Sequence, residues 1–117
     1  MTYVDGYLLV VPKKNVKEYI KMAKMGKKMW MKHGALDYKE CKGDDLKQLY
    51  GMRTFTKVAN CKPNEVPFFS FIVYKSKAHR NKVNAAVMKD PEMQKAPEKM
   101  PFNPKRMAFG GFETVVE

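Results

Sequence analysis

The sequence predicts one α+β domain in which two helices pack on one face of an antiparallel sheet. Its length of 117 residues fits about one ordinary domain, so residues 1–117 are taken as a single unit. Apolar residues recur every second position in some segments and every third or fourth in others. These segments follow in the order strand, helix, strand, strand, helix, strand, which is the ferredoxin-like βαββαβ arrangement.

The first half of the chain supplies three of these elements. Alternation over Tyr3–Val11 predicts a strand, and helical spacing predicts a long amphipathic helix over Val16–His33. Asn15 is the expected N-cap of that helix, and Gly34 follows its end as a left-handed residue. Leu36–Lys42 then reads as the second strand.

The second half supplies the other three elements. Phe68–Tyr74 gives the strongest strand pattern, and the next helix is capped by Ser76 and stopped by Asp90-Pro91. Residues 46–66 are ambiguous, and we expect a short strand over Met52–Val58. The proline-rich segment 91–104 predicts a packed loop with one helical turn near its start, and Arg106–Val116 predicts the last strand.

Right-handed connections place both helices on one face of such a sheet and leave the other face bare. An apolar bare face usually marks an interface, so a second copy of the chain or stacked bases should cover it. The residues expected on this face, and therefore in a dimer interface, are Tyr3, Tyr7, Leu9, Phe69, Phe71 and Val73. Asp5 would share that face and would need a partner such as Arg53, Arg106 or a lysine.

The net charge of +11 favours anionic partners, including nucleic acid. However, five lysines recur at helical spacing, which favours the wet face of one helix over a nucleic-acid footprint. They are Lys17, Lys21, Lys24, Lys28 and Lys32.

Cysteine usage and the apolar runs indicate a cytoplasmic protein that does not enter a membrane. Cys41 and Cys61 stand in no metal or redox motif, which suits a reducing compartment. No apolar run approaches the roughly 20 residues that span a bilayer. Asp44-Asp45 fits turn chemistry better than a metal site, so we expect neither a metal nor a cofactor.

Several blocks of sequence resemble the bacterial YbaA-like family of small uncharacterised proteins, in order and over essentially the whole chain. They include Tyr3-Val-Asp-Gly, His33-Gly-Ala-Leu, Phe69-Ser-Phe-Ile-Val-Tyr-Lys-Ser, Val87-Met-Lys-Asp-Pro and Lys105-Arg-Met-Ala-Phe-Gly-Gly-Phe-Glu. The resemblance implies a homodimeric α/β barrel in which two ferredoxin-like sheets face each other. It implies no activity, because the family is a domain of unknown function.

The aromatic strand leaves an RNA-binding alternative open. Phe69–Tyr74 fills the last six places of the RNA-recognition pattern, but Pro67 and Phe68 stand where a basic residue and a glycine belong. Filling of a dimer barrel is therefore favoured over base stacking by Phe69 and Phe71. A structural or regulatory dimer without a ligand is a further alternative.

A pocket beneath the helices is the leading functional hypothesis, because small residues on central strands leave space there. We expect it to bind a small hydrophobic or aromatic compound, and whether the protein is an enzyme stays open. His79 or His33 would be the acid or base of any catalysis. The expected pocket residues are Gly6, Trp30, Phe68, Ser70, Tyr74, Asn84 and Gly110, with Tyr74 and Asn84 as hydrogen-bond donors.

Overall fold

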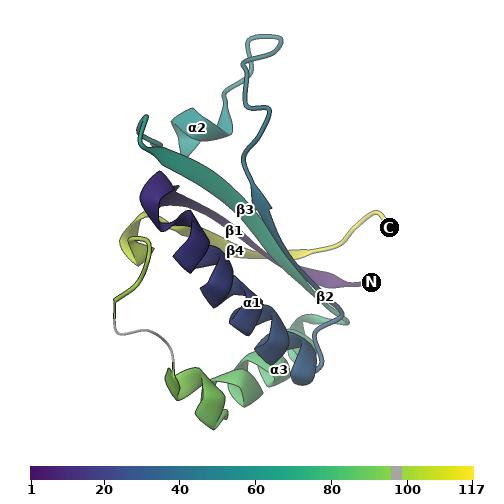
Figure 1. Ribbon diagram of the computed structural model, residues 1–117. Helices are drawn as coiled ribbons and strands as arrows, with labels where there is room; N and C mark the ends of the chain where they lie inside the picture. The colour runs from purple at the N-terminus through teal and green to yellow at the C-terminus, as the bar shows by residue number, and fades with distance from the viewer. Residues whose placement is uncertain (96–98) are drawn as a thin grey trace.

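The computed structural model describes residues 1–95 and 99–117 as a four-stranded antiparallel sheet with helices packed on it (Figure 1). The predicted α+β class is therefore confirmed. The strands lie in the order β2-β3-β1-β4. Their bounds are β1 Tyr3–Pro12, β2 Asp37–Lys42, β3 Glu65–Tyr74 and β4 Ala108–Glu113.

The helices follow the predicted order, with one addition. The α-helices are α1 Val16–Lys32, α2 Phe55–Val58 and α3 Lys77–Lys89, and short 3-10 segments span Lys13–Asn15, Pro91–Lys95 and Pro104–Arg106. The segment Pro91–Lys95 confirms the helical turn expected at the start of the proline-rich loop. Residues 96–98 of that loop lie outside the described residues.

The helix ends agree with the sequence at three of four expected positions, since α3 ends at Lys89, directly before Asp90-Pro91. Ser76 Oγ accepts from the His79 N–H at 3.1 Å, and Gly34 ends α1 with a φ of 112°. Asn15 does not cap α1 through its side chain, because its Nδ2 instead donates to the Pro101 carbonyl at 3.0 Å. That bond ties the start of α1 to the segment that precedes β4.

The strand expected over Met52–Val58 is wrong. Thr54 Oγ1 accepts from the Lys57 N–H at 3.1 Å and starts the short helix α2 at Phe55. Phe55 packs edge-on against Phe69 of β3, with ring centroids 6.0 Å apart. Local capping and this one aromatic contact therefore decide the conformation of a segment whose apolar pattern was ambiguous.

The core lies between the sheet and the two long helices, in two adjoining clusters. In one, Met29 of α1 and Val83 and Val87 of α3 pack with Ile72 and Tyr74 of β3. The other cluster contains Leu9, Val11, Tyr19, Ala23 and Phe68. Burial of these side chains is the main stabilising contribution to the fold.

The predicted face of β1 is wrong for Tyr3, Tyr7 and Leu9, which lie on the helix side of the sheet. The β1–β3 register pairs Tyr7 with Ser70 and Leu9 with Phe68, and Leu9 is only 2% exposed beneath α1. Alternation identifies the residues that share a face but not which face the helices cover. Because β1 is apolar on both faces, its sequence could not decide between them.

The face of the sheet away from the helices carries a different set of side chains. Phe69, Phe71 and Val73 of β3 lie there as predicted, and Phe69 is 47% exposed. In the register they lie opposite Leu8, Gly6 and Val4 of β1. Gly6 also pairs with Gly110 of β4, and an open hollow of about 610 Å³ lies over this pair.

Asp5 shares the helix side of the sheet with Tyr3 and Tyr7, contrary to the prediction, and it is fully buried. Its partner is Arg80 of α3, with Nε 3.7 Å from Oδ1, rather than Arg53 or Arg106. Burial raises the pKa of Asp5, and the charge of Arg80 opposes that rise. Arg106 instead pairs with Glu65 at the start of β3.

Replacing Met29 by alanine tests the packing of α1 on the sheet. Met29 is fully buried whereas Met25, one turn earlier, is 40% exposed, so Met29→Ala should lower the free energy of unfolding by about 2–5 kcal/mol. Met25→Ala is the matched control and should change it by less than about 1 kcal/mol. Urea denaturation measures both, and equal losses would contradict this packing.

Candidate functional site

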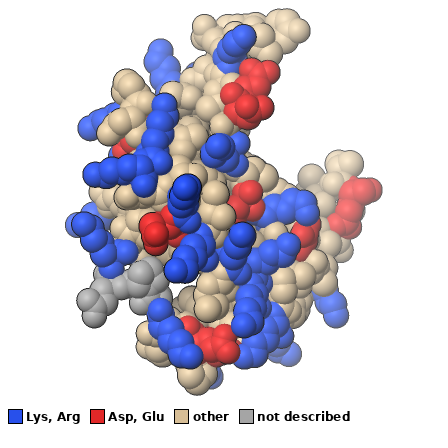
Figure 2. All heavy atoms as spheres, in the orientation of Figure 1, with Lys and Arg blue, Asp and Glu red and all other residues tan. Residues whose placement is uncertain are grey.

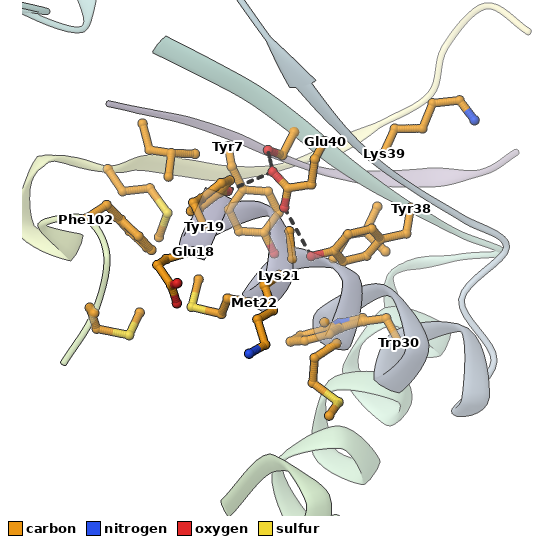
Figure 3. Close-up of a pocket in the computed structure, with 18 of the residues that line it drawn as sticks. Tyr7, Glu18, Tyr19, Lys21, Met22, Trp30, Tyr38, Lys39, Glu40 and Phe102 are labelled. Carbon is orange, nitrogen blue, oxygen red and sulfur yellow. Dashed lines mark hydrogen bonds between the residues drawn. The ribbon is translucent and has the colours of Figure 1, made fainter. Parts of the chain in front are cut away.

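A cavity of about 590 Å³ lies between α1, the helix side of the sheet and the segment that leads to β4 (Figure 3). Its apolar walls are rich in methionine, a flexible side chain that adapts to different shapes. The walls are formed by Leu9, Met22, Ala23, Met25, Trp30, Ile72, Met93, Met100, Phe102 and Met107. The volume and this composition fit a site for a small molecule.

The polar floor of the cavity is built around the carboxylate of Glu40. Glu40 Oε1 accepts hydrogen bonds from the hydroxyls of Tyr19, at 2.7 Å, and Ser70. Glu40 Oε2 accepts from the Tyr38 hydroxyl at 3.1 Å. Figure 3 shows these groups converging on one point.

Local structure explains why these groups meet. Tyr38 and Glu40 are two residues apart on β2, so both point to the helix side, and Ser70 pairs with Glu40 in the β2–β3 register. Tyr19 comes from the inner face of α1. Three elements that are distant in sequence therefore each contribute to the floor.

The tyrosines around Glu40 are held in their neutral form. Burial raises the pKa of Tyr19 and of Tyr38 well above the ordinary value, and the nearby charge of Glu40 raises both further. Burial raises the pKa of Tyr7 in the same way, with added effects from Asp5 and Glu40. Among the described residues, Tyr7 lines the cavity without a hydrogen-bond partner for its hydroxyl, so it can serve a ligand.

Trp30 forms a wall that is fixed from behind. Its Nε1 donates to Asn84 Oδ1 at 3.0 Å, and the Tyr74 hydroxyl donates to the same oxygen at 3.2 Å. Gly26 helps to shape the cavity next to Trp30, because a Cβ there would lie 2.7 Å from the Tyr38 hydroxyl. Glycine inside a helix costs about 1 kcal/mol, and here it leaves Tyr38 room to reach Glu40.

The cavity contains only part of the predicted site. Trp30 and Ser70 line it as predicted, whereas Phe68 and Tyr74 are buried in the core and do not line it. Asn84 also lies outside the lining, behind Trp30.

Gly6 and Gly110 are on the opposite face of the sheet, where they line the second hollow. They were expected on the helix side, and the reversed face of β1 explains that error, because Gly6 alternates with Tyr7.

Neither histidine lines the cavity, so the structure does not bring the predicted acid or base to it. His33 Nε2 lies 2.7 Å from Asp90 Oδ2, next to the Lys32–Asp90 ion pair. His79 Nδ1 accepts from the Lys75 N–H at 2.9 Å. Both histidines hold helix ends, which sequence spacing alone could not distinguish from a position in a pocket.

Sequence reasoning missed Glu40, Tyr19 and Tyr38, and it assigned Tyr7 to the interface. One signal was available, because a carboxylate stands two residues after a tyrosine in a strand and so shares its face. Tyr38 and Glu40 line the cavity only if their face of β2 is the one that the helices cover, and the pattern of β2 does not show which face that is.

The described residues, 1–95 and 99–117, lack two features that would indicate other functions. They contain no group of three or more histidine, cysteine, aspartate or glutamate side chains arranged to hold a metal ion. No helix among them combines the length and apolar character needed to cross a membrane.

The fold and the cavity define a small α+β domain with a polar-floored site beneath its first helix. The family described as "Protein of unknown function (DUF1428)" matches residues 2–104. The chain is 37% identical to the "Uncharacterized protein YbaA" of Escherichia coli K12, over 100% of this chain and 99% of that protein. The YbaA protein of Shigella flexneri gives the same values. The chain therefore belongs to the DUF1428 family, which confirms the resemblance to YbaA-like proteins.

Tyr19→Phe tests the environment of the floor through the pH dependence of stability. The pKa of Tyr19 is higher in the folded than in the unfolded protein, where tyrosine ionises near pH 10. The neutral hydroxyl therefore contributes stability that is fully present below about pH 10 and is lost as pH rises beyond it. The difference in free energy of unfolding between wild type and Tyr19→Phe should shrink from pH 8 to pH 11 in urea titrations. A constant difference would contradict a buried hydroxyl bound to Glu40.

Proposed function

We propose that the protein binds a small, mainly hydrophobic or aromatic molecule in the cavity beneath α1. One observation carries this proposal: apolar walls enclose about 590 Å³ above a single cluster of hydrogen-bonding groups. Ligand sites generally combine such walls with a few polar groups that fix orientation. The methionines Met22, Met25 and Met93 suit a ligand whose shape the walls can follow.

The same geometry supports cofactor-independent acid–base chemistry as a second candidate function. Glu40 is a carboxylate that could accept a proton, and the neutral Tyr7 hydroxyl could donate a hydrogen bond to a developing negative charge. Glu40 and Tyr7 replace His33 and His79 as the candidate acid–base residues, because Glu40 and Tyr7 line the cavity and the histidines do not. Binding alone accounts for every feature of the site, so it is the leading function.

We also propose that the chain is a ferredoxin-like domain that forms a homodimeric α/β barrel through its sheet. The strand order β4-β1-β3-β2, with α1 and α3 as the connections, supports the ferredoxin-like assignment. The aromatic face away from the helices supports the dimer, because Phe69 and Phe112 are 47% and 63% exposed. The proposed interface keeps Phe69, Phe71 and Val73 and replaces Tyr3, Tyr7 and Leu9 by Val4, Leu8 and Phe112.

The distribution of charge favours this dimer over nucleic-acid binding. The lysines Lys17, Lys24 and Lys28 of α1 are exposed. Figure 2 shows many basic side chains on the face of the molecule that carries α1 in Figure 1. Phe69 and Phe71 lie on the other side of the sheet. Single-stranded nucleic acid needs the stacking platform and the positive charge on one surface.

Met22→Trp tests the binding site by filling the cavity from α1. Binding of the neutral aromatic probe N-phenyl-1-naphthylamine, followed by its own fluorescence, should weaken at least tenfold because the larger ring occupies the ligand volume. Met31→Trp adds the same side chain to α1 outside the lining and should leave the affinity unchanged. Equal affinities for wild type and Met22→Trp would overturn the proposed site.

Phe69→Glu tests the dimer. Light scattering on the purified wild type should give twice the chain mass of 13.6 kDa, and Phe69→Glu should give the mass of one chain, because a buried unpaired charge opposes association. Ile20→Glu, which alters an exposed position of α1, should remain dimeric. A monomeric wild type would contradict the dimer and restore the RNA-binding alternative.

A further inference from the structure

We propose that the ligand of this cavity is a small organic cation, an amine or quaternary ammonium on an apolar or aromatic body, with Glu40 as its counter-ion. The inference rests on the proposed binding function and specifies the charge of the ligand. It follows from three properties of the floor: an unbalanced negative charge, an unused acceptor position and a set of aromatic rings.

The charge of Glu40 has no balancing cation within the part of the chain that the structure describes. Its hydrogen-bond partners are the three neutral hydroxyls of Tyr19, Tyr38 and Ser70. None of the ion pairs among the described residues includes Glu40. Glu40 is partly buried beside apolar walls, where the attraction between opposite charges is stronger than in water, so a cationic ligand in the cavity would pair with it favourably.

The lysines of the lining do not fill this role. The Lys39 ammonium pairs with Asp37 at 3.1 Å, and Lys39 lies on the face of β2 opposite to Glu40. Lys21 and Lys95 also line the cavity, but both are exposed and neither makes an ion pair with Glu40. Figure 3 shows the nitrogen atoms of Lys21 and Lys39 turned away from the carboxylate.

The hydrogen bonds of the floor leave room for one more donor. Glu40 Oε1 accepts from two hydroxyls, whereas Oε2 accepts from Tyr38 alone among the residues that the structure describes. A carboxylate offers about four acceptor positions, so Oε2 can accept from a ligand N–H or contact an N-methyl group. The hydroxyl oxygen of Tyr7 adds a second acceptor in the same cavity.

Aromatic rings surround the carboxylate and suit a cation in the same way. The rings of Trp30 and Tyr38 lie 6.2 Å apart, and those of Tyr19 and Phe102 lie 5.5 Å apart, all in the cavity lining. Aromatic faces attract cations through the ring quadrupole, most strongly for tryptophan. An anionic ligand would meet repulsion from Glu40, and a neutral ligand would gain only the apolar contacts.

The net charge of +11 does not oppose this assignment at short range. Solvent-exposed charges are screened beyond about 8–10 Å at physiological ionic strength. The exposed lysines therefore lower the encounter rate of a cation more than its affinity, whereas Glu40 acts in direct contact.

The test compares two isosteres that differ only in charge, phenyltrimethylammonium and tert-butylbenzene. Trp30 is the only tryptophan of the chain and lines the cavity, so its fluorescence reports binding of either probe. Wild type should bind the cation at least tenfold more tightly than the neutral isostere. Glu40→Gln should abolish this preference while it still binds tert-butylbenzene, whereas Glu113→Gln, which removes a carboxylate of β4 outside the cavity, should retain the preference.

Each outcome separates the two proposals. If wild type binds tert-butylbenzene as tightly as the cation, the counter-ion role of Glu40 is overturned while small-molecule binding stands. If neither isostere nor N-phenyl-1-naphthylamine binds, the proposed function fails and this inference fails with it. The wild-type comparison decides the charge of the ligand even if Glu40→Gln does not fold.

Discussion

The antiparallel pairing of β1 with β3 is the constraint on which the rest of the molecule depends. The two strands pair along their full length, from Tyr3 opposite Tyr74 to Pro12 opposite Glu65. This register sends Leu9 and Phe68 to the helices, and it sends Leu8 and Phe69 to the other face. A slip of one residue would exchange the two faces, so burial of the core also fixes the position of the cavity.

The helix side of the sheet holds two acidic side chains with different partners: Asp5 is fully buried, whereas Glu40 is partly buried. Glu40 is surrounded by hydroxyls, whereas Asp5 has Arg80 Nε at 3.7 Å and no hydrogen bond to either oxygen among the described residues. Burial therefore raises the pKa of Asp5 in spite of the nearby guanidinium. Asp5 already has its cation, which is why Glu40 rather than Asp5 is the group that a charged ligand would serve.

The sequence predicted the helices and strands better than it predicted which face of each strand the helices cover. The pattern of Phe68–Tyr74 and the caps at Ser76 and Gly34 depend on near neighbours, and the structure has them as predicted. The face of β1 depends on which apolar set the helices cover, and no local signal carries that information.

Prediction of the candidate site depended on the same question, namely which face of each strand the helices cover. Trp30 and Ser70 line the cavity on either choice of face for β1, because their own patterns turn them to the core. Tyr7 and Glu40 belong to the site only because β1 and β2 turn those faces to α1. Their roles follow from packing between elements, which a single sequence does not record.

Two walls of the cavity differ in how they are built. Trp30 is fixed through Asn84 of α3, whereas Met93 and Met100 belong to the segment between α3 and β4. Asp90 anchors the start of that segment. It accepts from Lys32 and from the Glu92 N–H, and the hydrogen bond from Lys32 is the main cause that holds the pKa of Asp90 far below its usual value.

His33 belongs to this anchor, since its Nε2 lies 2.7 Å from the same Asp90 oxygen. Because Asp90 stays ionised throughout the physiological pH range, the anchor holds there, and Asn15 fixes the far end of the segment at Pro101. Met93 and Met100 have flexible side chains that can adjust to a ligand, while Glu40 and Trp30 are held by hydrogen bonds. The site thus combines a hydrogen-bonded polar floor with flexible methionine side chains, an arrangement that would select a ligand by its charged end more than by the shape of its body.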